Sequence, residues 1–144
     1  MQTRYTFNKT ALRLGFRSGL EQQHATELNT AQVNYLYEDK ENRIAYSKPV
    51  TKHTYLPDFS FPGTNIVIES KGLFDTASRK KHLLIQQQHP DLDVRFVFSN
   101  MNQRIGKKSK TTYAMWAEKN GFQYADKHIP QAWIEEIKNE STAD

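Results

Sequence analysis

The chain has 144 residues, no cysteine and a formal charge of +4. The lack of cysteine excludes disulfides, zinc–thiolate centres and a thiolate nucleophile, so a metal would be held by oxygen or imidazole ligands. The hydrophobic content of 37% is enough for one domain with a core, and no apolar run has signal-peptide or membrane-spanning character. We therefore expect a single cytoplasmic domain over residues 1–144, with no membrane partner.

Basic residues are concentrated at the start of the chain and acidic residues at its end. The first 20 residues contain four basic side chains and no acidic one, and Arg17 is the last of the four. A basic excess favours a polyanionic partner, although it also occurs in proteins that bind no nucleic acid. An arginine-rich start is also typical of an organellar transit peptide. Here it runs directly into a functional motif, which favours a nucleic-acid contact that includes Arg17.

The motif Ser18-Gly19-Leu20-Glu21 predicts the start of a helix. A serine followed three residues later by glutamate has the form of a capping box, and apolar residues at helical spacing extend the helix to about residue 30. These residues leave two interpretations of Glu21: it caps the helix, or it is a functional carboxylate.

The segments that follow are extended. Residues 33–38 alternate like a strand, residues 39–43 form a polar turn, and residues 44–50 are a second extended run. Pro49 cannot donate to a sheet ladder, so this run suits an edge strand or a bridge better than a central strand. We take residues 44–55 as a candidate bridge between two subunits.

Residues 57–71, PDFSFPGTNIVIESK, predict a tight β-hairpin that turns at Gly63-Thr64. In this register Asp58 faces Glu69, with apolar side chains on one face of the hairpin and Asp58, Glu69 and Lys71 on the other. The unbroken β-branched run at 66–68 is typical of a strand covered on both faces, so the charges that follow it emerge from a buried element.

Two carboxylates that face each other across a ladder repel unless a positive charge lies between them. A divalent cation such as Mg²⁺ fits this place, because it takes carboxylate oxygens and accepts phosphate oxygens in its remaining positions. Lys71 projects toward the same ion and phosphate. The alternative is a solvated hairpin face, where Asp, Glu and Lys are common. The buried strand beneath them favours a functional site.

The second half of the chain predicts three helices and a strand. A helix over residues 76–88 is stopped by His89-Pro90, residues 94–98 form a half-buried strand, and a helix over residues 112–120 ends at Gly121. A last helix begins at Pro130. The expected fold is α/β, with a mixed and mostly hairpin-built sheet.

Two basic clusters are candidates for binding phosphates. The first turns of the helix over 76–88 carry Arg79, Lys80, Lys81 and His82, where the helix dipole disfavours cations, so their placement suggests a ligand. The alternative is a solvated helix start whose long side chains cover apolar surface. Lys107 and Lys108, in a loop, form the weaker candidate because charged loops are usually only solvated.

Six segments spread over nearly the whole chain resemble the phage T7 endonuclease I family, and they are far more specific than a short PD…ExK match. They are FRSGLE at 16–21, HTYLPDF at 53–59, IVIESKG at 66–72, RKKHLLI at 79–85, QHPDLDVRFVFS at 88–99 and YADKHIPQAWI at 124–134. The resemblance implies a restriction-endonuclease-like PD-(D/E)XK core, with a mixed β-sheet flanked by helices, in an intertwined homodimer.

The same resemblance implies the activity and its residues. The family resolves four-way (Holliday) junctions and other branched DNA by paired nicks, so a phage-encoded member would act in the host cytoplasm. Glu21, Asp58 and Glu69 match the metal-ligand carboxylates, the backbone carbonyl of Ser70 a further ligand, and Lys71 the catalytic lysine. Two Mg²⁺ or Mn²⁺ ions per site are expected. An acidic end replaces the family's basic tail, which bears on affinity and substrate preference.

Two other classes of function remain open from the sequence. A sequence-specific or repair-type endonuclease on the same fold would need an element that reads bases. A non-catalytic branched-DNA-binding protein would not need Glu21, Asp58, Glu69 and Lys71 together.

Overall fold

The computed structural model describes residues 4–5, 16, 19–48 and 51–142. Within them, a six-stranded sheet has the order β1-β2-β5-β6-β7-β8, and β3 and β4 form a separate two-stranded sheet. The strands are β1 (Arg4–Tyr5), β2 (Tyr35–Tyr37), β3 (Ile44–Lys48), β4 (Thr51–Tyr55), β5 (Phe59–Ser60), β6 (Ile66–Lys71), β7 (Asp93–Phe98) and β8 (Gln123–Asp126). The helices are α1 (Gly19–Thr30), α2 (Thr76–Gln88), α3 (Tyr113–Lys119) and α4 (Gln131–Thr142), with a 3₁₀ turn η2 (Lys40–Asn42).

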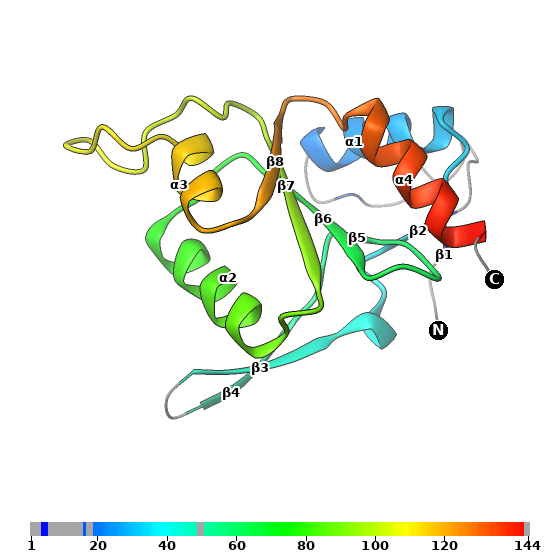
Figure 1. The fold of residues 1–144 in the computed structure, drawn as a ribbon, viewed down its shortest axis with the longest axis horizontal. Coiled ribbons are helices and arrows are strands. Elements are labelled where there is room, and N and C mark those ends of the chain that lie inside the picture. The colour runs from blue at the N-terminus through cyan, green and yellow to red at the C-terminus, as the bar shows by residue number, and fades with distance from the viewer. Residues whose placement is uncertain (1–3, 6–15, 17–18, 49–50, 143–144) are drawn as a thin grey trace.

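The main sheet lies between two layers of helices, with α1 and α4 on one face and α2 and α3 on the other (Figure 1). Ile66 and Ile68 of β6 belong to the apolar core that includes residues of α1 and α4, whereas Val67 belongs to the core that includes Trp116 of α3. β6 is therefore covered on both faces, which confirms the prediction from its β-branched run.

The predicted hairpin register is confirmed, since Phe59 pairs with Ile68 and Ser60 with Val67. Gly63 sits in the turn with φ of 81°, a left-handed conformation that glycine adopts without a steric cost. Because β5 has only two residues, Asp58 lies just before the paired segment, at the mouth of the hairpin.

The sheet is mixed, as predicted, but it is not mostly hairpin-built. β6, β7 and β8 run parallel, because α2 and α3 carry the chain back between them. β8 was not predicted, and β7 was expected to be half-buried. β7 lies between β6 and β8 with helices over both faces, so five of its six residues are buried.

The four helices lie where the sequence predicts them. Asp75 caps α2 by accepting a bond from the backbone N–H of Ser78 (2.9 Å), and Thr112 caps α3 in the same way through Met115 (3.1 Å). Ser18 of the expected capping box lies outside the described residues. No helix in the described ranges has the length and apolar character needed to cross a membrane.

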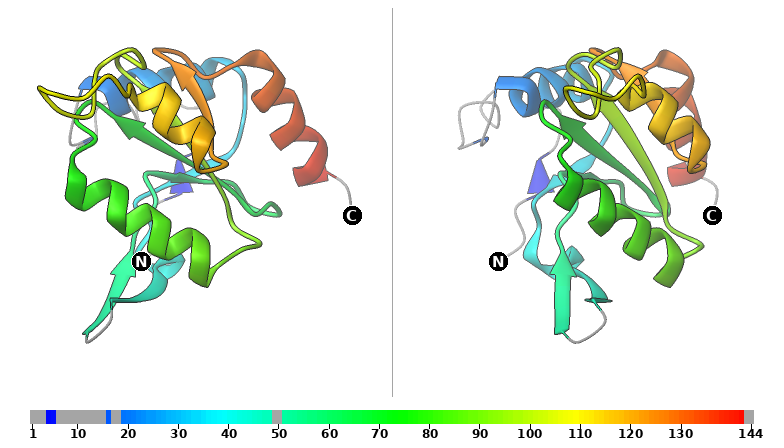
Figure 2. Two further views of the ribbon diagram at one scale, coloured as in Figure 1. Left: turned by 60° about the vertical axis from the view of Figure 1, so that its left-hand side comes forward. Right: turned by 90° about the vertical axis from the view of Figure 1, so that its left-hand side faces the viewer.

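β3 and β4 form an arm outside the main sheet (Figure 2). They pair antiparallel along their whole length, from Ile44 with Tyr55 to Lys48 with Thr51. The side chain of Gln88, at the end of α2, bonds to both backbone groups of Ser47 at 2.7 and 2.6 Å and holds the arm against the helix. The segment expected as an edge strand or bridge is thus extended, and its role between subunits stays a prediction.

Candidate metal centre

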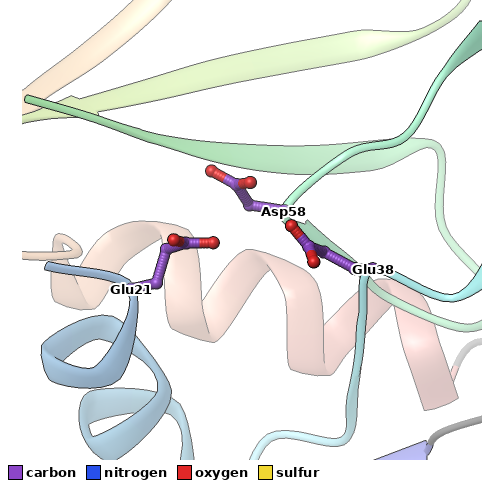
Figure 3. Close-up of side chains that lie close together, drawn as sticks. All are labelled: Glu21, Glu38 and Asp58. Carbon is purple, nitrogen blue, oxygen red and sulfur yellow. The ribbon is translucent and has the colours of Figure 1, made fainter. Parts of the chain in front are cut away.

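Three carboxylates from separate segments meet beside the start of the hairpin. Glu21 comes from the first turn of α1, Glu38 follows β2, and Asp58 precedes β5; one oxygen from each lies within 4.8 Å of the other two. Figure 3 shows the three side chains directed toward one another. An ion that binds oxygens at about 2.0–2.6 Å can bridge oxygens spaced in this way. The donor set, all carboxylate oxygen, fits a hard cation such as Mg²⁺ or Mn²⁺.

Local structure holds Glu21 and Glu38 in place. The buried hydroxyl of Tyr37 donates a 2.6 Å hydrogen bond to Oε1 of Glu21, and the Tyr37 ring packs edge-on against Phe16. Glu38, the next residue, has φ of 43°, and its backbone N–H donates to the carbonyl of Asp58 (3.2 Å). A positive φ is uncommon for a residue with a side chain and here turns the Glu38 carboxylate toward the cluster.

Glu38 was not among the residues predicted from the sequence. It ends the alternating strand predicted over residues 33–38, next to the polar turn at 39–43, where a charged side chain is ordinarily solvated. Its left-handed backbone conformation distinguishes it from an ordinary turn residue. This conformation has no signature in the sequence.

Asp58 and Glu69 are neighbours across the hairpin, as predicted. Each carboxylate accepts a hydrogen bond from a backbone N–H across the hairpin. The Glu69 carboxylate accepts from the N–H of Asp58 (3.1 Å), and the Asp58 carboxylate accepts from the N–H of Ser70 (2.9 Å). These exchanged bonds extend the ladder past the two paired residues of β5. The side chain of Glu69 is not part of the group formed by Glu21, Glu38 and Asp58, since its second oxygen faces His82 at 3.7 Å.

The two carboxylates of this pair are shifted in opposite directions. Burial, and then the adjacent charge of Glu69, raise the pKa of Asp58 well above its ordinary value. Burial alone would also raise the pKa of Glu69, but the charge of Lys71 and the hydrogen bond to Asp58 outweigh it and the pKa of Glu69 is lowered. Asp58 is thus the carboxyl that holds a proton most readily, and a bound cation would take the place of that proton.

His82, which the sequence placed with the phosphate-binding residues, is fully buried. Its ring packs edge-on against Tyr55 and Phe96, with centroid distances of 5.2 and 4.9 Å, and burial lowers its pKa to about 3. A side chain enclosed in the core cannot reach a DNA phosphate, so we remove His82 from that set. Its Nε2 lies 3.7 Å from Oε1 of Glu69.

The other basic candidates lie at or near the surface, except that Arg17 falls outside the described residues. The guanidinium of Arg79 donates to the carbonyl of Phe74 (2.6 Å) and to Thr76, and the Lys81 ammonium lies 5.1 Å from the centroid of the Tyr55 ring. Lys80 is exposed. Arg79 therefore stabilises the start of α2, Lys81 contacts the end of β4, and Lys80 is the most accessible of the three.

Lys107 and Lys108 are exposed in the loop that precedes α3. This loop and the segment before α2 enclose a groove of about 410 Å³, whose lining includes Leu73, Arg104 and Lys107. Leu73 is 69% exposed and lies two residues after Lys71, so the groove begins just past the end of β6.

The fold and the site together define an α/β domain with a cluster of carboxylates that could hold a cation and a lysine on the adjoining strand. These groups are the ones used in metal-dependent phosphate-ester chemistry. The chain belongs to the phage endonuclease I family, whose model matches residues 1–144.

Two relatives are similar over most of their length. Endonuclease I of Escherichia phage T7 is 46% identical over 125 residues, which are 87% of this chain and 82% of the relative. Endodeoxyribonuclease 1 of Enterobacteria phage T3 is 47% identical over 125 residues, 87% of this chain and 80% of the relative. The family expected from the six sequence segments is therefore confirmed.

Proposed function

We propose that this chain is a metal-dependent endodeoxyribonuclease that hydrolyses phosphodiester bonds in four-way junctions and other branched DNA. The observation that carries the proposal is the meeting of Glu21, Glu38 and Asp58 next to the Asp58–Glu69 pair. The relatives of phages T7 and T3, named an endonuclease and an endodeoxyribonuclease, support DNA as the substrate.

Magnesium or manganese ions, two per site, would polarise the attacking water and stabilise the leaving 3′ oxygen. Asp58, Glu69 and Glu21 would supply the carboxylates that hold the ions, and the Ser70 carbonyl would be a further ligand. Glu38 joins this set because of its distance to Glu21 and Asp58.

Lys71 has a separate role in the proposal. It lies two residues after Glu69 on β6, so both side chains leave the same face of the strand. From there it neutralises charge that develops on the phosphate or orients the water. Its influence on the pKa of Glu69 supports this placement beside the carboxylates.

Exposed cations would hold the DNA backbone on both sides of the site. Lys80 on α2, and Lys107 and Lys108 beside the groove, are the described candidates; Arg17 stays a prediction from the sequence. Phosphate contacts read position and shape with little base information, so we expect selectivity for branch geometry.

We further propose that the enzyme is an intertwined homodimer. A junction is cut on two symmetrically placed strands, which requires two sites related by a two-fold axis. The arm formed by β3 and β4 links the segment that carries Glu21 and Glu38 to the one that carries Asp58. The same antiparallel pairing can form between two chains, which would exchange these segments.

The test is a cleavage gel with linear duplex, mismatched duplex and a four-way junction, each with and without Mg²⁺. Cleavage of the junction alone, only with the metal, is the expected result. Cleavage of linear duplex at one sequence would instead favour a sequence-specific nuclease. Junction binding with no cleavage in either Mg²⁺ or Mn²⁺ would show a binding protein without catalysis.

A further inference from the structure

His24 connects two parts of the chain that are distant in sequence. It lies on α1 three residues after Glu21, so the two side chains share a face of the helix, and it is fully buried. Its Nδ1 is hydrogen-bonded to the hydroxyl of Ser70 on β6. Its Nε2 lies 3.0 Å from the carbonyl oxygen of Lys127, just after β8.

The partners decide the direction of these bonds. A backbone carbonyl can only accept, so Nε2 carries the hydrogen that reaches Lys127. In the neutral ring Nδ1 is then an acceptor, and the Ser70 hydroxyl donates to it. Both nitrogen atoms are used, which holds the ring in one orientation.

Ser70 is also hydrogen-bonded to Asp58. Its backbone N–H donates to Oδ2 of Asp58 at 2.9 Å, while its hydroxyl is held by His24. One residue therefore ties the carboxylate of Asp58 to the helix that carries Glu21.

We propose that the His24–Ser70 pair is a positioning device that sets the spacing between Glu21 and Asp58, and through it the affinity of the centre for its cation. The inference rests on the proposed function, because it assumes that these carboxylates bind a metal. It differs from a purely structural role, in which His24 would only add stability to the packing of α1.

The chain offers a matched control in Gln23. Its side-chain amide donates to the same Lys127 carbonyl (2.9 Å) from the neighbouring position on α1, and it also contacts His128 in the turn after β8. Gln23→Ala thus removes a bond between α1 and that turn without touching the link to Asp58.

The experiment measures Mn²⁺ binding by calorimetry, without DNA, for wild type, His24→Ala, Ser70→Ala, the double variant and Gln23→Ala. Ser70→Ala keeps the backbone N–H and carbonyl and removes only the hydroxyl. Loss of one buried hydrogen bond predicts a rise in Kd of about three- to tenfold for each single variant, and no further rise in the double variant. Gln23→Ala should bind like wild type.

Nicking of a junction at varied Mg²⁺ gives a second readout. The Mg²⁺ concentration for half-maximal rate should rise in both His24→Ala and Ser70→Ala. For His24→Ala, the rate at saturating Mg²⁺ should stay near wild type. His24→Asn, whose side-chain oxygen can accept the Ser70 hydroxyl, should recover part of the affinity that His24→Ala loses.

Three outcomes would overturn the inference. They are unchanged Mn²⁺ affinity in Ser70→Ala, additive losses in the double variant, and an equal loss in Gln23→Ala. If His24→Ala does not fold, the comparison of Ser70→Ala with Gln23→Ala still decides the question. Failure of the wild type itself to bind Mn²⁺ would refute the proposed metal-dependent function. It would not refute the hydrogen bond between His24 and Ser70.

Discussion

At the mouth of the hairpin three carboxylates face one another, whereas on β7 the fully buried Arg95 is held between two acids. Arg95 bonds to both oxygens of Asp93 (3.1 and 2.7 Å) and to both of Glu136 (2.8 and 3.0 Å), and it lies 5.4 Å from the centroid of the Trp133 ring. We call these the carboxylate cluster (Glu21, Glu38, Asp58) and the arginine cluster (Arg95, Asp93, Glu136).

The pKa values of the acids differ in direction between the two clusters. Burial and neighbouring carboxylates raise the pKa of Asp58, whereas the hydrogen bond from Arg95 lowers the pKa of Glu136. Opposite charges within the arginine cluster satisfy each other, so this cluster contributes to the fold. Like charges gathered in the carboxylate cluster cost stability unless a cation binds, which is the arrangement expected of a functional site.

The largest effect is expected from single changes in the carboxylate site. Asp58→Asn and Glu69→Gln should each reduce junction cleavage by at least about 100-fold, because a ligand charge is lost, while binding to the junction stays near wild type. Lys71→Ala should reduce the cleavage rate at saturating metal, since a contact to the developing charge is lost. Single-turnover nicking and gel shifts in Ca²⁺ measure the two properties. Parallel loss of binding would assign these residues to the fold.

A heterodimer tests whether the carboxylate cluster spans two chains. In an intertwined dimer made of one Glu21→Ala chain and one Asp58→Asn chain, both changes fall in one site and the other site is wild type. Junctions should then be nicked on one side. The arginine cluster lies within residues 93–136 and should not be shared between chains. Purified heterodimer that does not nick, beside an active wild-type control, would rule out a shared site.

Breaking the arginine cluster should affect stability and not chemistry. Arg95→Met is expected to lower the free energy of unfolding by about 3 kcal/mol, toward the low end of the range for a broken buried pair. The reason is that Asp93 and Glu136 are 31% and 43% exposed and can be hydrated again. Urea unfolding measures the loss. The rate of cleavage per folded molecule should be unchanged. A lower rate under conditions where the variant is fully folded would contradict the assignment of the arginine cluster to stability alone.

The two clusters should also make opposite contributions to the pH dependence of the free energy of unfolding. The pKa of Glu136 is lower in the folded chain, so its contribution is present above the ordinary Glu value of about 4.3 and is lost as pH falls through the folded pKa. The pKa of Asp58 is raised, so without metal it destabilises the fold as pH rises from about 3.9 through its folded value.

Glu136→Gln and Asp58→Asn separate these contributions. Glu136→Gln should lose less stability than wild type on acidification, and Asp58→Asn should lose less on going from acid to neutral pH in EDTA. Chemical unfolding at a series of pH values gives both curves. Plots of unfolding free energy against pH that run parallel to the wild-type plot would contradict the assigned pKa shifts of Glu136 and Asp58.

The smallest effect concerns DNA binding. Neutralising Lys80 and Lys81 should flatten the dependence of junction affinity on salt by roughly one unit for each lost phosphate contact. The Lys107 and Lys108 double change should have a smaller effect. Arg95→Met removes one positive charge from a site already neutralised within the fold, so its salt slope should match wild type. An unchanged slope in the Lys80 and Lys81 variant would mark that helix start as merely solvated.

Much of this architecture follows from local patterns. The alternation of apolar side chains and the Gly63 turn set the pairing of Phe59 with Ile68, and hence the meeting of Asp58 with Glu69. Capping residues and Pro90 mark the ends of α2, because free backbone groups at helix ends are satisfied by nearby side chains. Family membership also could be inferred, since six ordered segments carry it.

Other features depend on elements that are distant in sequence. Glu38 enters the carboxylate cluster through a left-handed backbone, Arg95 is buried because Glu136 reaches it from α4, and His82 is enclosed by Tyr55, Phe74 and Phe96. A charged residue has the same local pattern whether it ends in solvent or in a buried pair. Its desolvation and its partners are set only when the sheet and the helices pack, so the tertiary structure alone decided which charges stabilise the fold and which are gathered for a ligand.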